Sequence, residues 1–395
     1  MQEMRVCPYS INNMNDQQVV RFRRLPRIST YIVAWCIGEM QKVSKGIISI
    51  YSTSNIQNAQ YALELASRTV AFYEEYFGIN YQLDKLDICV IPDFTNYAME
   101  NWGLICIKET YCLFNEETAF AGQKPDLADT ITHELSHQWF GNLISPVWWD
   151  DLWLNEGFAT WIAIFAAEQL QISERNEILS PQLIRGTDEN NLDVILYHNA
   201  HLIDWAPWKE FYTVFGYNRG LYADSLRSSK PIRTPIFSGS EAGDAFNPVT
   251  YQKSAAIIRM IQQYYGPEPF RERLSTYLKK FAFSNATSKD FFGVFNNDSL
   301  NVVQMTDYWL SNPGFPVIKV ESDGTLSQYR MTNREVQKED SNWPLSLNIL
   351  VLPKKIQLLK CLEMNMLIRK FSHQKLRYIK RMCYFLQDAA ISMKN

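Results

Sequence analysis

The pentapeptide His133-Glu134-Leu135-Ser136-His137 constrains this 395-residue chain more than any other feature. On a helix, two histidines four residues apart lie on one face, one turn apart, so both imidazoles can bind the same cation. The intervening Glu134 can hold a water at that cation without being a ligand itself. The pattern therefore predicts a zinc-binding helix. A catalytic zinc typically takes three protein ligands, so one more must be found.

The pentapeptide alone is a moderate signal, because it also occurs on helices whose histidines are only polar surface groups. The residues that follow it narrow the choice. Phe140 and Leu143 stand where a metzincin would carry glycine and histidine, which excludes that subclass.

The third ligand is expected from the apolar segment at residues 148–159, which predicts a second helix. This helix would return Glu156, nineteen residues beyond His137, to the metal as an oxygen ligand. The expected metal ligands are then His133, His137 and Glu156, a set of two histidines and one glutamate.

Four segments carry further motifs in a fixed order. Residues 133–143 (HELSHQWFGNL) precede residues 148–159 (WWDDLWLNEGFA), and residues 97–104 read YAMENWGL. Residues 249–255 read VTYQKSA, and Trp309 is followed by GFPV at residues 314–317. Together these segments resemble the M1 (gluzincin) zinc aminopeptidase family over about residues 10–345. They are similar to its zinc motif, its GAMENWGL exopeptidase motif, its YxKGA segment and the end of its catalytic domain.

The resemblance implies two catalytic residues and one Zn²⁺ per chain. Glu134 would act as general base and then general acid. The Tyr251 hydroxyl would stabilise the negatively charged oxygen of the tetrahedral intermediate. Without its flanking residues, Tyr251 would be read as one of the 21 tyrosines, packed on a helix.

The resemblance also implies how a substrate is held. Glu100 would pair with the free α-ammonium of a peptide, which explains cleavage from the amino end. A solvated loop carboxylate is the alternative for Glu100. Neighbouring residues expected to bind substrate are Ala98, Met99 and Asn101.

The chain departs from the family pattern at several positions. Tyr97 replaces the motif glycine, which predicts a narrowed or re-aimed cleft. Ser254 replaces a second glycine. The segment at about residues 172–215 is expected to be an insertion. Within it, His198 and His201 are interpreted as surface histidines because no cysteine or carboxylate cluster lies near them in the sequence.

The expected architecture is α+β, with a thermolysin-like catalytic domain at residues 43–313. Residues 1–42 would be the remnant of an N-terminal β-domain, and residues 314–350 a partial C-terminal β-sandwich, so truncation at both ends is expected. Clusters of β-branched residues predict strands at residues 46–51 and 86–91. Apolar periodicity predicts helices at residues 59–76, 126–139, 154–170, 251–264 and 269–281.

Residues 351–395 are expected to be a basic tail of unknown structure. From residue 354 onward the chain has ten Lys or Arg and two acidic residues. Such a segment could dock on nucleic acid or an anionic membrane. A solvated helix or a tail unrelated to the family is the preferred interpretation, and no nucleic-acid partner is expected.

Composition agrees with a globular enzyme, at 46% hydrophobic and 14% aromatic residues. The seven cysteines form no C-x-x-C pair, so neither a disulfide scaffold nor a cysteine zinc site is predicted. No apolar run reaches the roughly 18 residues of a membrane span. Residues 37–39 (IGE) resemble cytoplasmic members, and a membrane-anchored or secreted full-length form is left open.

The predicted function is a zinc-dependent aminopeptidase that acts on peptides with a free N-terminus. One alternative is a catalytically weak or inert peptide-binding fragment, which Tyr97 and the missing β-domain favour. A second alternative is an epoxide-hydrolysing relative of the same family. Ala98 fits the peptidase branch better than that relative.

Overall fold

The computed structural model describes most of the chain up to residue 320 and shorter stretches beyond it. The described residues are 2–3, 8–14, 17–22, 24–120, 122–178, 208, 219–296, 301–320, 326–332, 336–337, 343–344, 347–351, 357–361 and 366–369. Most of the predicted insertion, including His198 and His201, and much of the basic tail lie outside these residues.

The chain divides into two compact units, and each contains discontinuous segments. The first comprises Met1–Ser145, Ile162–Trp205 and Leu278–Ala286. The second comprises Pro146–Trp161, Ala206–Tyr277 and Thr287–Asn395. Both units include parts of the predicted catalytic domain at residues 43–313, whose boundaries stay a prediction.

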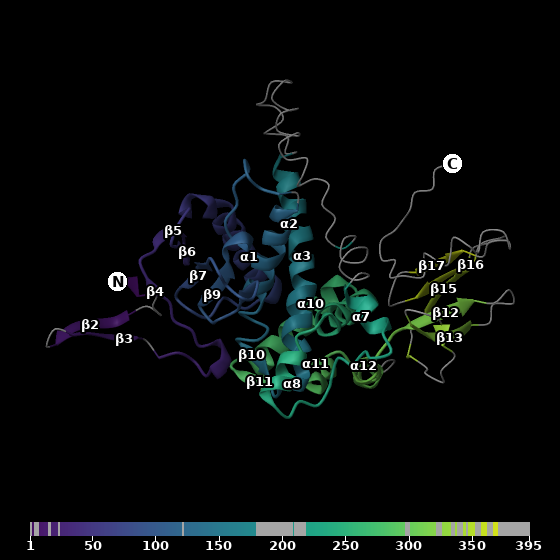
Figure 1. Ribbon diagram of the computed structural model, residues 1–395. Coiled ribbons are helices and arrows are strands. Elements are labelled where there is room, and N and C mark those ends of the chain that lie inside the picture. The colour runs from purple at the N-terminus through teal and green to yellow at the C-terminus, as the bar shows by residue number, and fades with distance from the viewer. Residues whose placement is uncertain are drawn as a thin grey trace, which may run out of the picture. The chain divides into compact units, whose positions relative to one another are not determined.

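A five-stranded mixed sheet forms the centre of the first unit (Figure 1). Its order is β5-β6-β7-β9-β8, with β6, β7 and β9 parallel and β5 and β8 antiparallel at the edges. The bounds are β5 Gln41–Lys45, β6 Ile48–Ser52, β7 Leu86–Ile91, β8 Ala98–Met99 and β9 Leu104–Lys108. The predicted strands at residues 46–51 and 86–91 are confirmed as β6 and β7. Because β5 belongs to this sheet, the sheet begins two residues before the predicted boundary at residue 43.

Helices α1 (Gln60–Phe77) and α2 (Gln123–Ser136) pack against each other in the first unit. The buried Tyr73 of α1 donates a hydrogen bond to the carbonyl oxygen of Thr132 at 2.9 Å. Trp139, just beyond α2, lies edge-on to Tyr73 with 5.8 Å between ring centroids. These contacts fix the end of α2 that carries the histidines.

Helix α3 (Trp153–Ile178) begins in the second unit and continues into the first. The helix predicted at residues 154–170 is confirmed, and the observed helix continues to Ile178. Within the first unit, Phe165 of α3 packs against Tyr76 of α1, with ring centroids 5.2 Å apart.

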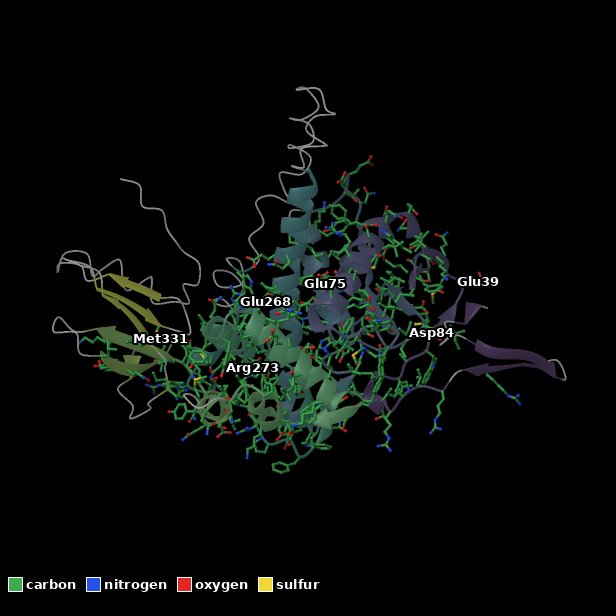
Figure 2. All side chains as sticks on the ribbon, turned by 180° about the vertical axis from the view of Figure 1, so that it is seen from behind. Glu39, Glu75, Asp84, Glu268, Arg273 and Met331 are labelled. Atoms are coloured by element: carbon green, nitrogen blue, oxygen red, sulfur yellow. The ribbon has the colours of Figure 1, made fainter. Side chains whose placement is uncertain are left out.

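The second unit has an aromatic core around the first turns of α3. Phe158 lies edge-on to Phe291 at 4.7 Å, and Trp153 stacks on Phe292 at 5.3 Å between ring centroids. Among the described residues, the further helices of this unit are α7 Tyr222–Ser225, α8 Gly239–Asp244, the π-helical turn η6 Val249–Lys253, α9 Ser254–Tyr265, α10 Pro267–Phe281, α11 Ser288–Gly293 and α12 Val302–Ser311. The last four residues of α10 belong to the first unit. The predicted helices at residues 251–264 and 269–281 are therefore confirmed, the first with a π-helical start. The exposed side chains of Glu75 on α1 and Glu268 on α10 are labelled in Figure 2.

Gly157 of α3 lies against Ser254 of α9. A Cβ placed on Gly157 would be 2.6 Å from the Ser254 Cβ and closer still to its hydroxyl. We therefore expect Gly157→Ala to destabilise the fold by about 1–3 kcal/mol, and Gly157→Ala/Ser254→Gly to recover most of that loss. Urea unfolding measures both variants, beside the control Gly243→Ala, whose added methyl group would meet nothing within 4 Å. Equal midpoints for Gly157→Ala and the wild type would contradict this packing.

Several shorter elements belong to the same two units. They are β1 Gln2–Glu3 with β4 Ile37–Gly38, the hairpin of β2 Pro8–Met14 and β3 Gln17–Phe22, β10 Ile144–Pro146 with β11 Ser284–Ala286, and the 3₁₀ turns η1 Thr30–Ile32, η2 Ile56–Ala59, η3 Glu109–Tyr111 and η4 Trp149–Asp151.

Two three-stranded sheets follow α12. One contains β12 Pro316–Val320, β13 Leu326–Met331 and β14 Val336–Gln337. The other contains β15 Leu347–Val351, β16 Gln357–Cys361 and β17 Met366–Arg369. The described residues of the basic tail up to residue 369 thus form strands, and the interpretation as a helix is wrong there. The predicted β-sandwich stays a prediction.

Candidate functional site

The two histidines of the pentapeptide lie together at the end of α2. Their ring centroids are 4.7 Å apart, and their Nε2 atoms lie 3.1 Å from each other. The α-helix ends at Ser136, three residues before its predicted end. The chain turns back there, because the amide of Asn142 donates to the carbonyl oxygen of His137 at 3.0 Å, and Gly141 takes a φ of 126°.

The ring of His137 is oriented by the backbone. Its Nδ1 lies 2.9 Å from the carbonyl oxygen of Phe140. A carbonyl oxygen only accepts hydrogen bonds, so Nδ1 carries the proton and Nε2 carries a lone pair. This second contact of a ligand histidine is the arrangement that metal sites use to fix the tautomer. His137 is 1% exposed, so the lone pair points into a buried region.

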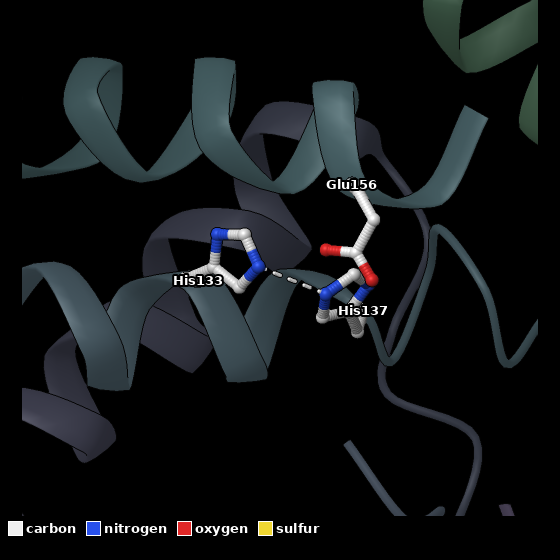
Figure 3. Close-up of side chains that lie close together, drawn as sticks. All are labelled: His133, His137 and Glu156. Atoms are coloured by element: carbon white, nitrogen blue, oxygen red, sulfur yellow. Dashed lines mark hydrogen bonds between the residues drawn. The ribbon is translucent and has the colours of Figure 1, made fainter. Parts of the chain in front are cut away.

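Glu156 completes a group of three candidate metal ligands. One ring nitrogen of each histidine and one carboxylate oxygen of Glu156 all lie within 4.8 Å of one another (Figure 3). Glu156 is buried in the first turn of α3, where the helix dipole favours a carboxylate anion.

These residues fit a zinc ion. Two imidazoles and a carboxylate are a donor set that zinc takes in catalytic sites. Tetrahedral zinc at about 2.0–2.1 Å from each nitrogen separates the two nitrogens by roughly 3.3 Å. The observed 3.1 Å between the Nε2 atoms is close to that value.

Two buried carboxylates lie beside the same histidine. Glu100, Glu134 and His137 form a second group whose ligand atoms are within 4.8 Å of one another, and all three belong to the first unit. Glu100 and Glu134 are 6% and 7% exposed. Glu100 is therefore not a solvated loop carboxylate. Its neighbour Asn101 is equally buried.

The segment that carries Glu100 is bound to the end of α2 by two side chains that the sequence reasoning did not single out. Asn142 Nδ2 donates to the carbonyl oxygen of Glu100 at 2.8 Å, and Gln138 Nε2 donates to the same oxygen at 3.3 Å. Gln138 Oε1 in turn accepts from the amide of Gly103 at 3.4 Å. The position of both residues beside the pentapeptide was the available signal, and their partners lie about 40 residues away along the chain.

Removing one of these donors tests the link. We expect Asn142→Ala to destabilise the fold by about 1–3 kcal/mol, because the buried carbonyl of Glu100 loses its shorter hydrogen bond. The exposed Asn80 offers a matched control as Asn80→Ala. Thermal unfolding followed by circular dichroism measures the difference. Equal midpoints for the two variants would show that this hydrogen bond contributes nothing.

The remaining predicted substrate-binding residues form the edge strand of the sheet. Ala98 and Met99 make up β8 and pair with Ile107 and Cys106 of β9. The side chain of Tyr97 is 63% exposed and meets Tyr111 edge-on, with 5.0 Å between ring centroids. A cleft narrowed by Tyr97 stays a prediction.

Tyr251 lies in η6, a π-helical turn in the second unit. Such turns are rare and are frequent at functional sites. Two residues further on, the buried Lys253 forms an ion pair with Asp224 of α7 at 3.0 Å. Lys253 also donates to the carbonyl oxygens of Asn312 and Gly314, at 3.0 and 2.8 Å. This network, which the sequence reasoning missed, holds η6 in place.

A comparison with models of protein families shows which family this chain belongs to. The model named "Peptidase family M1 domain" matches residues 61–309, more than half of the chain. The chain belongs to peptidase family M1. The recognised motifs at residues 97–104, 133–143, 148–159 and 249–255 all fall inside the matched M1 region.

Curated M1 relatives are similar over a larger part of the chain. Aminopeptidase M1-D of Oryza sativa subsp. japonica is 35% identical over 315 residues, which are 78% of this chain and 32% of the relative. Mitochondrial aminopeptidase 2 of Saccharomyces cerevisiae is 32% identical over 332 residues, 82% of this chain and 32% of its own. Tricorn protease-interacting factor F2 of Thermoplasma volcanium is 31% identical over 354 residues, which are 87% of this chain and 41% of the relative.

The chain thus spans about a third of the length of the first two M1 relatives and two fifths of the third. It shares with them the region that contains the candidate metal ligands. In the part of the chain that the structure describes, no helix is both long and apolar enough to cross a membrane.

Proposed function

We propose that this chain is the catalytic part of a zinc-dependent aminopeptidase, with a thermolysin-like catalytic domain. The observation that carries the proposal is that two groups of three candidate metal-binding residues both contain His137. One group offers two imidazoles and the carboxylate of Glu156 to a metal. The other brings the carboxylates of Glu100 and Glu134 to the same place. The names of the M1 relatives support the same reaction.

Glu134 has the position of the proton carrier. A zinc ion bound by His133, His137 and Glu156 would act as a Lewis acid on the scissile carbonyl and lower the pKa of the attacking water. The Glu134 carboxylate would take the proton of that water as it attacks and then deliver it to the leaving amine. Its burial supports this role, because it limits competition by bulk water.

Glu100 is the proposed anchor for the amino end of a peptide. The α-ammonium of a substrate would lie between the buried carboxylates of Glu100 and Glu134 and would make charge-assisted hydrogen bonds. A peptide without a free amine would leave the buried Glu100 without a cation, which disfavours its binding. The edge strand β8, which directly precedes Glu100, offers backbone groups to an extended peptide in the manner of an added strand. Met99, Ala98 and Asn101 would line this part of the substrate site.

Tyr251 is the proposed stabiliser of the oxyanion. Its hydroxyl would donate a hydrogen bond to the oxygen that becomes negative during attack. The rigid support of η6 by Lys253 and Asp224 favours such a role, since an oxyanion donor must be positioned before the reaction.

An assay with paired substrates tests the proposal. The purified chain, supplied with zinc, is incubated with a panel of aminoacyl fluorogenic substrates and with the N-acetylated form of each. We expect release from the free-amine substrates only, and a higher KM for them in Glu100→Gln. No release from any free-amine substrate would overturn the proposal for this chain and favour the alternative of an inert peptide-binding fragment. Equal cleavage of the acetylated forms would overturn the role of Glu100.

A cytoplasmic location of this chain stays a prediction.

A further inference from the structure

Three cysteines of the first unit gather at one face of the sheet. Cys89 of β7 and Cys106 of β9 are direct neighbours in the parallel ladder. Cys36, in the segment just before β4, packs against the buried cluster that contains both thiols. Met99 of β8 and Met40 pack against the same cluster. We call Cys36, Cys89 and Cys106 the thiol cluster.

The members of the thiol cluster differ in access. Cys89 and Cys106 are buried, at 1% and 6% exposure, whereas Cys36 is half-buried. A small oxidant in solution therefore meets Cys36 first. Cys112, also in the first unit, is fully buried outside the cluster.

The electrostatic surroundings of the three thiols also favour Cys36 as the first to react. Hydrogen bonds from the thiols of Cys106 and Cys89 lower the pKa of Cys36, so its thiolate is stabilised. The hydrogen bond to Cys36 and burial raise the pKa of both partners. The nearby Asp87 carboxylate raises the pKa of Cys89, and that of Glu134 raises the pKa of Cys106. The thiolate is the reactive form of cysteine.

We propose that the thiol cluster is an oxidative modification site, in which Cys36 reacts with a peroxide and Cys89 or Cys106 then forms a disulfide with it. A half-exposed thiolate beside a second thiol is the arrangement of a redox-sensitive cysteine with its resolving partner. Here two resolving thiols stand next to one reactive thiol.

The reaction balances with hydrogen peroxide as the oxidant. The Cys36 thiolate attacks one peroxide oxygen, the O–O bond breaks, and after protonation Cys36 is a sulfenic acid and one water has formed. The thiol of Cys89 or Cys106 then attacks the Cys36 sulfur and loses its proton. The S–O bond breaks, the hydroxide leaves with that proton as a second water, and the S–S bond remains. Two sulfurs are oxidised by one electron each, and one peroxide is reduced.

The disulfide would connect the segment before β4 to a central strand of the sheet. If Cys106 resolves Cys36, the bridge ends on the residue paired with Met99, directly beside Glu100. Any effect of this bridge on substrate binding at Glu100 rests on the proposed function, but formation of the bridge does not.

Peptide mapping by mass spectrometry tests the proposal without any activity measurement. The full chain is used with Cys7, Cys361 and Cys383 replaced by serine, so that four cysteines remain. The reduced protein is treated with hydrogen peroxide and digested without reductant. We expect a Cys36 peptide joined to a Cys89 or Cys106 peptide, lighter by two hydrogen atoms than the separate thiols and separated again by dithiothreitol. Cys112 should stay reduced.

Variants separate the roles of the three thiols. Cys36→Ser should abolish the bridges to Cys36, and Cys112→Ala, the matched control, should leave them unchanged. Cys89→Ala and Cys106→Ala should each leave the other bridge. The double variant should stop at a sulfenic acid on Cys36 that dimedone traps. Circular dichroism shows whether each variant is folded. Cys36 that stays reduced, or that oxidises to a sulfonic acid without any bridge, would overturn the proposal, as would bridged Cys112.

Discussion

Glu134→Gln lowers kcat for release of an N-terminal residue by about 10²- to 10⁴-fold and leaves the zinc content unchanged, because the amide cannot carry the proton from water to the leaving amine. Gln keeps the size of the side chain, and Glu134 is outside the proposed ligand set, so metal binding is not expected to change. Kinetics with an aminoacyl fluorogenic substrate, together with metal analysis of the same sample, measure both quantities.

Glu117→Gln is the matched control for this variant. Glu117 is an exposed glutamate of the same unit, and its loss should leave kcat within the error of the wild type. A Glu134→Gln enzyme as active as Glu117→Gln would remove Glu134 from the reaction. Loss of zinc in Glu134→Gln would instead mean that Glu134 supports the metal.

Lys253→Met is expected to lower the free energy of unfolding by about 3–5 kcal/mol, since removal of one partner of a buried ion pair leaves the other charge buried without compensation. Asp224 is 1% exposed. Burial lowers the pKa of Lys253, while the Asp224 carboxylate opposes that shift. The carbonyl oxygens of Asn312 and Gly314 lose a donor in the same variant. Urea unfolding measures the change.

The double variant Asp224→Asn/Lys253→Met separates the charge from the rest of the network. Asn keeps an oxygen that can accept from the amide of Gly314, a contact of 2.7 Å in the wild type. We expect this variant to be more stable than Lys253→Met alone, since no unpaired charge remains. Lys230→Met, which removes an exposed lysine from a surface ion pair, serves as the control and should change stability little. Equal stability of Lys253→Met and Lys230→Met would contradict the anchoring of η6.

The parts of the site that were predictable lie close together in sequence or follow a period. The spacing of His133 and His137 predicts their common helix face, and apolar periodicity predicts the helix that begins near Glu156. Clustered β-branched residues predict β6 and β7, and both strands are largely buried in the sheet. The family resemblance supplied Glu100 and Tyr251, whose residue types alone indicated nothing specific.

The parts that were missed depend on contacts between distant segments. The hydrogen bonds of Gln138 and Asn142 to Glu100 join residues about 40 positions apart. The ion pair of Lys253 with Asp224 and the gathering of Cys36 with two sheet cysteines are equally invisible along the chain. The earlier end of α2 has a local cause instead, because the backbone amide of Asn142 donates to the carbonyl oxygen of His137, five residues earlier.

Zinc stoichiometry tests whether His133, His137 and Glu156 bind a metal ion. The purified chain is equilibrated with zinc, separated from free metal and analysed for metal content. We expect about one zinc per chain in the wild type, and none in His133→Ala/His137→Ala or in Glu156→Ala. The double variant His198→Ala/His201→Ala, which removes the other closely spaced pair among the five histidines, should keep the full content. Wild-type protein that binds no zinc, or a zinc content that survives the loss of both His133 and His137, would rule out a zinc site at these residues.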